Sequence, residues 1–320
     1  MELHRNKLIA AFTPIAFFRA INGSYDMENV RKLTYKTTLT DQEWQELVSL
    51  YNQKFQEERK RNDEQKKKHA QLKEKFQEKI TQLKKIAASI PEITDIFLVN
   101  SYALGSLKET SDIDLLVITK PDTMWWTRLK LTAALELAGI RRKPGNIEEQ
   151  FCLSFFITEN AMDMSKIAID DDLYLHFWIS SVQSLLNRSL SSWHEQNPWL
   201  KDIFPSFSMQ DFTSPPVPAQ LIVPPTTPTS SPPSSSHFLN SLVRPLMQWR
   251  HRMKQKQLGP EASIVVSDTM FKFHNLDRRQ HYKEQTLQEL ERLLAQANSK
   301  ACPERQSKGS KLGIELQLRI

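Results

Sequence analysis

Residues 96–118, IFLVNSYALGSLKETSDIDLLVI, contain two apolar runs joined by a turn-rich connection. The runs at 96–99 and 113–118 have the length and composition of buried strands. Asp112 and Asp114 stand at the entrance of the second run. Residues two apart on a strand project to the same face, and two carboxylates there repel each other unless a cation lies between them. The pattern predicts a divalent metal site, and Mg²⁺ suits it because it takes one or two carboxylates together with water and substrate phosphates.

The connection between the two runs adds a second pattern. Ser101, Ala103 and Gly105 alternate after the first run, and Ser111 directly precedes Asp112. Together these positions resemble the signature of the DNA polymerase β-type nucleotidyltransferase superfamily, whose small members read G-S-x-A-x-G, a short variable stretch, then S-D-x-D. The resemblance implies that the two aspartates hold Mg²⁺ and are catalytic. It also implies that the serine and glycine positions bind the nucleotide.

Two positions depart from that family. Asn100 stands where the family has its first glycine. Asn tolerates left-handed backbone well, so we expect the turn to survive and Asn100 to remain at the nucleotide site, although its side chain takes space near the phosphates. The family also uses a third carboxylate on a neighbouring strand, but the strand expected at 151–158 has no Asp or Glu. Ser154 aligns with the missing acid, and Glu149 and Glu159 lie just outside the strand.

The resemblance implies an α+β fold: a nucleotidyltransferase core with a short mixed sheet and helices on one side, flanked by a long basic helix and a mostly helical C-terminal region. The whole arrangement, including the late FHNLDRR element, resembles a group of uncharacterised bacterial nucleotidyltransferase-domain proteins. We expect these parts: a small helical segment similar to a reduced winged helix or simply a cap on the next helix (1–39), a long basic helix (40–90), the core (91–205), a Pro/Ser-rich linker (206–236), a basic, mostly helical region (237–298) and a disordered tail (299–320).

Local signals support individual elements. Thr40 and Glu43 form a capping box that opens the long helix, whose middle, 56–68, lacks apolar anchors and is either a solvated strut or a break. Further helices are expected at 124–138, 171–186 and 193–204, then at 238–253 with a kink or restart at Pro245, and finally through 287–294. Strands are expected at 263–267 and 270–273. Trp125, Trp126 and His176 are interpreted as packing residues, and Arg128 either reaches a phosphate or forms a surface ion pair.

Charge is unevenly distributed along the 320 residues. The formal net charge is +6, but residues 91–205 carry 10 Lys/Arg against 16 Asp/Glu. Residues 54–85 carry 12 against 6, and residues 237–283 carry 9 against 3. The basic flanks therefore predict possible nucleic-acid binding, while intrahelical charge pairing on solvated helices is the alternative.

Composition excludes some classes. Cys152 and Cys302 are the only cysteines, far apart, so neither a disulfide framework nor a zinc site is indicated. The apolar stretch 8–21 contains Pro14 and Arg19 and is too short to span a membrane. We expect a cytoplasmic chain without a membrane partner.

Three functions remain open from the sequence. The first is a nucleotidyltransferase that moves a nucleoside monophosphate from Mg-NTP to an unidentified acceptor. The second is a catalytically impaired nucleotide-binding or interaction module, because of Asn100 and the missing acid. The third is a nucleic-acid-binding protein that acts through its basic flanks.

Overall fold

The computed structural model describes residues 5–208, 234–258, 262–274 and 276–298. Its centre is one mixed sheet of six strands in the order β4-β1-β2-β3-β6-β5. β2 and β3 run parallel, and every other neighbouring pair is antiparallel. The strands are β1 (Ile93–Leu98), β2 (Ile113–Thr119), β3 (Phe151–Thr158), β4 (Gln183–Ser184), β5 (Ser263–Val266) and β6 (Met270–His274). The expected α+β class, mixed sheet and helical flanks are confirmed.

Helices cover both faces of this sheet, whereas the sequence predicted helices on one side. Phe97, Leu116 and Phe155 point into one apolar cluster, while Ile96, Leu115 and Phe156 point into another. The central strands are apolar at both alternating sets of positions, so each face requires a cover. The helices α1 (Arg5–Ala20), α7 (Leu173–Ser181) and α11 (Arg279–Asn298) contribute to the first cluster, and α4 (Gln56–Ala88) and α6 (Met124–Leu137) to the second.

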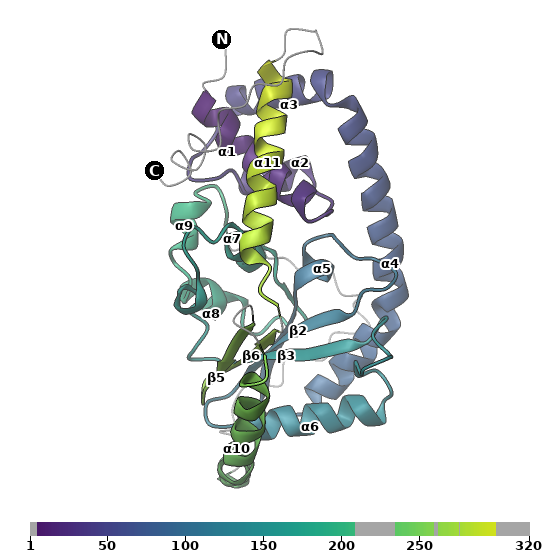
Figure 1. Cartoon of the computed structure of the whole chain (residues 1–320), viewed down its shortest axis with the longest axis vertical. Helices are drawn as coiled ribbons and strands as arrows, with labels where there is room; N and C mark the ends of the chain where they lie inside the picture. The colour runs from purple at the N-terminus through teal and green to yellow at the C-terminus, as the bar shows by residue number, and fades with distance from the viewer. Residues whose placement is uncertain (1–4, 209–233, 259–261, 275, 299–320) are drawn as a thin grey trace.

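The two ends of the described chain pack against each other. Helix α1, which contains Pro14, is buried on nearly all sides and lies beside α11 (Figure 1). Arg19 of α1 donates to Glu289 of α11 and to Glu58 of α4, at 2.7 Å in each case. Within residues 5–39 the structure has only α1 and the short α2 (Met27–Lys32) as regular elements. The N-terminal segment is therefore a helical cap that packs mainly on the C-terminal helix.

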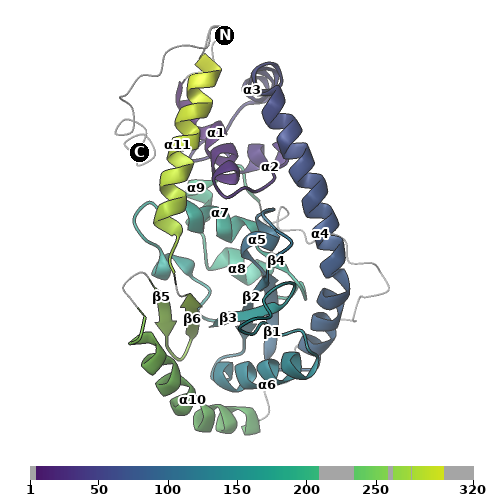
Figure 2. The same cartoon turned by 45° about the vertical axis from the view of Figure 1, so that its right-hand side comes forward.

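The expected long basic helix consists of two helices, α3 (Asp41–Lys54) and α4. The capping box of Thr40 and Glu43 is present at the start of α3, as predicted. The break falls at Phe55, which leaves the helical conformation (φ −121°, ψ 38°) and is buried. Its ring stacks on Tyr51 and meets Phe12 edge-on, so packing of this side chain replaces helical continuity. Helix α4 then runs from the N-terminal helices to the sheet (Figures 1 and 2).

Two predicted helices of the core are shorter than expected. The helix predicted at 171–186 ends with α7, and β4 follows because Gln183 and Ser184 pair with the edge of β1. The buried Asp95 of β1 accepts a hydrogen bond from Ser184 Oγ (2.7 Å), which holds this strand in place. The segment predicted at 193–204 divides into α8 (Leu190–Glu195) and α9 (Leu200–Ile203), with Pro198 between them. A 3₁₀ turn, Met164–Ile167, and the short helix α5 (Asn100–Ala103) complete the core.

The C-terminal region joins the core directly. Helix α10 (Ser234–Gln255) is one helix through Pro245, without the predicted restart. Asn240 of α10 accepts hydrogen bonds from the backbone N–H groups of Trp125 and Trp126, at 2.9 and 3.1 Å, and so caps α6. The β5–β6 hairpin, predicted as two strands, extends the core sheet beyond β3. The predicted linker, apart from its ends at 206–208 and 234–236, and the predicted tail lie outside the described residues.

Candidate functional site

The site is built at the entrance of β2. Asp114 is the second residue of β2, and Asp112 is the residue directly before the strand. The parallel neighbour β3 places Cys152 beside Asp114. One ligand atom from each of these three residues lies within 4.8 Å of the other two. The structure therefore brings the predicted aspartates together and adds a thiol that the sequence analysis did not identify.

Burial makes the carboxylate pair electrostatically unfavourable without a cation. Desolvation, followed by repulsion from Asp112, raises the pKa of Asp114 to about 6. A buried anion beside a second anion is stabilised by a nearby positive charge. Arg142 supplies one, because its Nη1 donates to Asp112 Oδ2 at 2.6 Å. A divalent cation between the two carboxylates would supply a larger positive charge.

The donor set fits one hard cation better than a soft one. Two carboxylates are suitable ligands for Mg²⁺, which completes its shell with water and phosphate oxygens. Burial raises the pKa of the Cys152 thiol to about 12, so this group is neutral, and its sulfur is a poor ligand for Mg²⁺. Cys152, the third group beside Asp112 and Asp114, therefore adds no charge.

Asn100 keeps the turn that the family forms with glycine. Its backbone is left-handed (φ 52°), as the sequence analysis expected of an Asn at this position. Its side-chain Nδ2 donates to Asp114 Oδ2 at 2.8 Å, and its Oδ1 accepts from Trp178 Nε1 at 2.7 Å. Only this orientation of the amide satisfies both partners. The side chain is therefore held against Asp114 and orients that carboxylate.

The other signature residues divide into two groups. Ser101 lines the cavity described below. Ser111 Oγ accepts a hydrogen bond from the Lys108 backbone N–H at 3.0 Å and fixes the turn before the metal-site strand. Gly105 has φ +69°, and a Cβ there would lie 2.9 Å from the Ser24 carbonyl oxygen. Nucleotide contacts by these residues stay predictions, and the structure gives Ser111 and Gly105 positioning roles.

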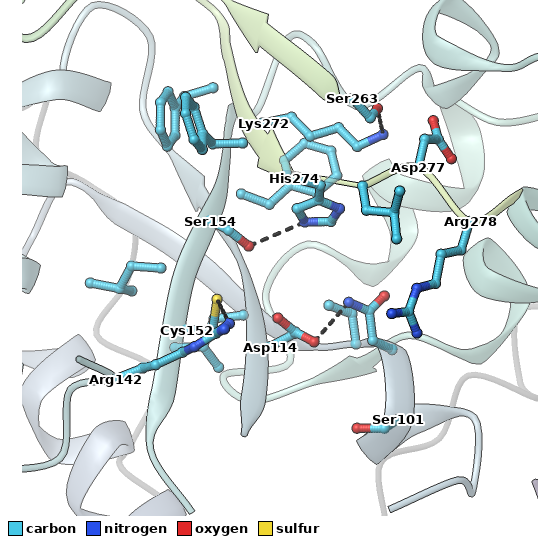
Figure 3. Close-up of a pocket in the computed structure, with 18 of the residues that line it drawn as sticks. Ser101, Asp114, Arg142, Cys152, Ser154, Ser263, Lys272, His274, Asp277 and Arg278 are labelled. Atoms are coloured by element: carbon cyan, nitrogen blue, oxygen red, sulfur yellow. Dashed lines mark hydrogen bonds between the residues drawn. The ribbon is translucent and has the colours of Figure 1, made fainter. Parts of the chain in front are cut away.

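A β-bulge lies in β3 between Cys152 and Phe155, at the predicted third position, Ser154. Between the pairs Asp114–Cys152 and Leu116–Phe155, β2 advances by two residues and β3 by three. Ser154 lies within this irregular stretch and lines the same cavity as Asp114 and Cys152. Its Oγ makes a hydrogen bond with His274 Nε2 at 3.2 Å (Figure 3). Ser154 as a metal ligand stays a prediction.

The two outlying glutamates have other partners. Glu149 precedes β3 at the correct end, but its carboxylate is paired with Lys79 of α4 at 3.3 Å. Glu159 follows β3, at the opposite end of the strand from Asp114, and accepts from Thr94 Oγ1 at 2.8 Å. Neither belongs to the candidate metal group.

A cavity of about 910 Å³ opens over Asp114. Its lining is strongly basic: nine Lys/Arg side chains face it, against Asp114 and Asp277 as acids. The nine are Arg128, Arg141, Arg142, Lys143, Arg250, Lys254, Lys272, Arg278 and Arg279. Figure 3 shows Arg142 on one side of Asp114 and Arg278 on the other, with Ser101 below. Such a lining, beside two carboxylates, suits a polyanion that carries a metal ion.

Much of this lining comes from the C-terminal region. Burial lowers the pKa of Lys272 to about 8, and its Nζ donates to Ser263 Oγ at 2.7 Å. Burial, and then the nearby Lys272, lowers the pKa of His274 to about 4, so its imidazole is neutral at pH 7. The FHNLDRR element stands out in the sequence by resemblance alone, and no local pattern there predicts its place in the wall of this cavity.

Arg279 fixes this element to the core. Its guanidinium donates to the buried Asp172 carboxylate and to the Ile167 carbonyl oxygen, at 2.7 Å each, and it also pairs with Asp277. Although burial acts in the opposite direction, these Arg279 contacts lower the pKa of Asp277 to about 2. Arg278 is exposed and makes no ion pair among the described residues, so it is available to an anion in the cavity.

The remaining sequence interpretations have mixed outcomes. Trp125 is fully buried against Phe271, and His176 bonds Tyr35 at 3.1 Å, so both are packing residues as predicted. Arg128 forms no ion pair among the described residues, so the surface ion pair is not observed, and the phosphate contact stays a prediction. Its guanidinium lies 4.1 Å from the Phe271 ring centroid, in the wall of the cavity.

Comparison with known proteins gives one match. Residues 80–147 match a family model described as a nucleotidyltransferase domain. The match includes both aspartates, Asn100 and Arg142, and it ends before β3. Neither the search of curated proteins nor the search of solved structures gave a match. Among the described residues, no helix is both long and apolar enough to cross a membrane.

Proposed function

We propose, from the match of residues 80–147 to a nucleotidyltransferase domain model, that the chain binds a Mg²⁺-bound nucleoside triphosphate and transfers its nucleoside monophosphate to an acceptor. The observation that carries the proposal is the half-buried carboxylate pair of Asp112 and Asp114, of which Asp114 lines a basic cavity. Carboxylates alone would repel a triphosphate, and basic side chains alone would not select a metal complex. Together they suit Mg-NTP.

Each group has a defined task in this proposal. Asp112 and Asp114 would hold Mg²⁺, and the ion would supply neutralisation of phosphate charge. Asn100 orients Asp114 through the 2.8 Å hydrogen bond. Arg142, which donates to Asp112 and lines the cavity, would pair with a phosphate oxygen of the bound nucleotide.

The C-terminal segment supports binding from the other wall of the cavity. Arg278 has no competing ion pair among the described residues, and Lys272 sits on β6 above Asp114 (Figure 3). Phosphoryl and nucleotidyl transfer depend mainly on positioning and charge neutralisation, so basic side chains from both walls favour the reaction. The acceptor oxygen attacks the α-phosphorus, and the bond between the α-phosphorus and the pyrophosphate oxygen breaks. The acceptor proton passes to solvent or to a neighbouring base.

The neutral Cys152 supports an alternative, an impaired nucleotide-binding module. A positioned base typically contributes on the order of 10²–10⁴ in rate. Ser154 stands where the family has its third carboxylate, and the nearby Cys152 thiol has a raised pKa. The alternative predicts Mg-NTP binding without pyrophosphate release.

One assay separates the two functions. The chain is incubated with Mg²⁺ and each NTP labelled at the α-phosphate, and label transfer, monophosphate formation and pyrophosphate are measured together. Water serves as an acceptor when no other is present. The proposal predicts pyrophosphate release that Asp112→Asn and Asp114→Asn abolish, while Asp122→Asn, an exposed aspartate beyond the other end of β2, leaves it unchanged. Binding without any release, at all four NTPs, favours the impaired module.

Nucleic-acid binding by the basic flanks, like a cytoplasmic location, stays a prediction. The structure favours a different use for the C-terminal flank, because five of its basic residues line the cavity: Arg250, Lys254, Lys272, Arg278 and Arg279. In α4, Lys66 and Lys79 are paired with Asp26 and Glu149. A steep salt dependence of RNA binding, retained after substitution of the cavity residues, would support the flank hypothesis.

A further inference from the structure

Helix α10 exposes an apolar stripe that the nucleotide site does not use. Five large apolar side chains on this helix are between 45% and 66% exposed: Phe238, Leu242, Leu246, Trp249 and Met253. At the helical spacing of about 100° per residue, these positions fall within a sector of about 80°. They therefore form one continuous stripe on the outer face of the helix.

The opposite face of α10 already has its partners. Val243 and Met247 pack against the apolar cluster on the α4 and α6 face of the sheet. Asn240 caps α6, and His251 lies against Trp125 and Phe271. The outer stripe is thus not needed to hold the helix on the protein. Figures 1 and 2 show α10 at the end of the molecule opposite α3. A ligand of extended surface can approach it there.

The charge of this helix is of one sign. Residues 234–255 contain Arg244, Arg250, Arg252 and Lys254 and no Asp or Glu. At the same helical spacing, Arg250 and Arg252 lie about 80° to either side of the centre of the stripe. Neither of them makes an ion pair among the described residues, whereas Arg244 is paired with Asp268 at 3.1 Å. The stripe is therefore bordered on both sides by unpaired positive charge.

We propose that α10 is an interfacial helix that docks the protein on an anionic lipid surface. An apolar stripe with Trp, Phe and Leu, bordered by Arg or Lys, lies in the headgroup region with its apolar side chains below and its cations on lipid phosphates. A second copy of the chain fits less well, because two such stripes face to face would bring four arginines together without an acid on either helix. A nucleic acid would pair with the arginines but would leave the apolar stripe in water.

The proposal also relates the lipid surface to the cavity. Arg250 borders the stripe and lines the cavity, so the cavity wall formed by α10 lies next to the docking face. This inference does not depend on nucleotidyl transfer, since it rests on the outer face of α10 alone.

Vesicle sedimentation tests the proposal. The full chain is mixed with phosphatidylcholine vesicles with and without phosphatidylserine, at low and high salt. We expect sedimentation only with the anionic vesicles, weakened by salt. Leu246→Gln and Trp249→Gln should each lower the partition coefficient by about tenfold or more, because each removes a large apolar side chain from the interface. Arg252→Gln should lower it by about fivefold, since each basic residue near the surface contributes about that factor.

The matched control is Leu137→Gln, which changes an exposed leucine (91%) on α6, away from the stripe. It should bind like the wild type. Absence of sedimentation with anionic vesicles, or equal loss in Leu137→Gln, overturns the proposal. So does concentration-dependent dimerisation without lipid that Leu246→Gln abolishes, because the stripe would then be covered by a second copy. Far-ultraviolet circular dichroism of each variant confirms that the fold is retained.

Discussion

Asp114→Asn is expected to stabilise the cation-free protein at neutral and alkaline pH. The pKa of Asp114 rises from an ordinary 3.8 to about 6, because the carboxyl is desolvated and lies beside Asp112. At about 1.4 kcal/mol per pH unit, this difference corresponds to about 3 kcal/mol of destabilisation when the group is ionised. An Asn at this position carries no charge, and its Oδ1 can still accept the hydrogen bond from Asn100.

The sign of the pH dependence follows from the same shift. Folding favours the protonated form of Asp114, so its favourable contribution to stability is fully present below the unfolded pKa, near 3.9, and is lost as pH rises through about 6. The stability difference between Asp114→Asn and wild type should therefore be about 1 kcal/mol near pH 4.5 and approach about 3 kcal/mol above pH 7.

Urea denaturation in the presence of EDTA, at several pH values between 4.5 and 8, measures this difference. Asp122→Asn is the control, because Asp122 is exposed and has a left-handed backbone (φ 56°) that Asn also tolerates. If Asp114→Asn is no more stable than wild type at pH 8, or if its advantage does not shrink in acid, Asp114 is not held as a desolvated anion and the argument for a cation at this site fails.

Three further substitutions test individual features. Cys152→Asp should raise the affinity for Mg²⁺, measured by calorimetry, about tenfold or more over Cys152→Ser, because hard cations bind more tightly as carboxylates are added; no gain would show that Cys152 is not at the third ligand position. Gly105→Ala should lower the free energy of unfolding by about 2 kcal/mol or more, from its positive φ and the close Ser24 carbonyl oxygen, and an unchanged urea midpoint would contradict this. Asn240→Ala should cost about 1 kcal/mol through the lost cap of α6, and an equal stability would mean that water replaces the cap.

Strong local patterns made much of the core predictable. Strand β3 has the predicted limits, β2 extends one residue further, and the capping box at Thr40 is present, because apolar periodicity and capping chemistry act over a few residues. The aspartate pair was predictable for the same reason. Its neighbour Cys152 was not, because only the parallel pairing of β2 with β3 places that thiol beside Asp114.

Long-range contacts account for the other differences. Phe55 interrupts the long helix because it packs on Phe12, more than 40 residues earlier in the chain, and nothing in the local sequence signals this contact. The basic C-terminal region was interpreted as a nucleic-acid flank, yet the pairing of β6 with β3 brings Lys272 and His274 into the cavity that Asp114 lines. Composition gives the charge of a segment, but only the tertiary fold gives the direction in which that charge faces.

Calorimetric titration of the full chain with each NTP, in the presence of Mg²⁺, tests the central claim most directly. The account predicts binding of at least one NTP that requires Mg²⁺, is lost in both Asp112→Asn and Asp114→Asn, and is weakened about tenfold or more in Arg278→Ala through loss of a phosphate contact. Arg244→Ala, which removes an arginine paired with Asp268 outside the cavity, should bind like wild type. Unchanged Mg-NTP affinity in both aspartate variants, or binding that does not need Mg²⁺, would contradict the account.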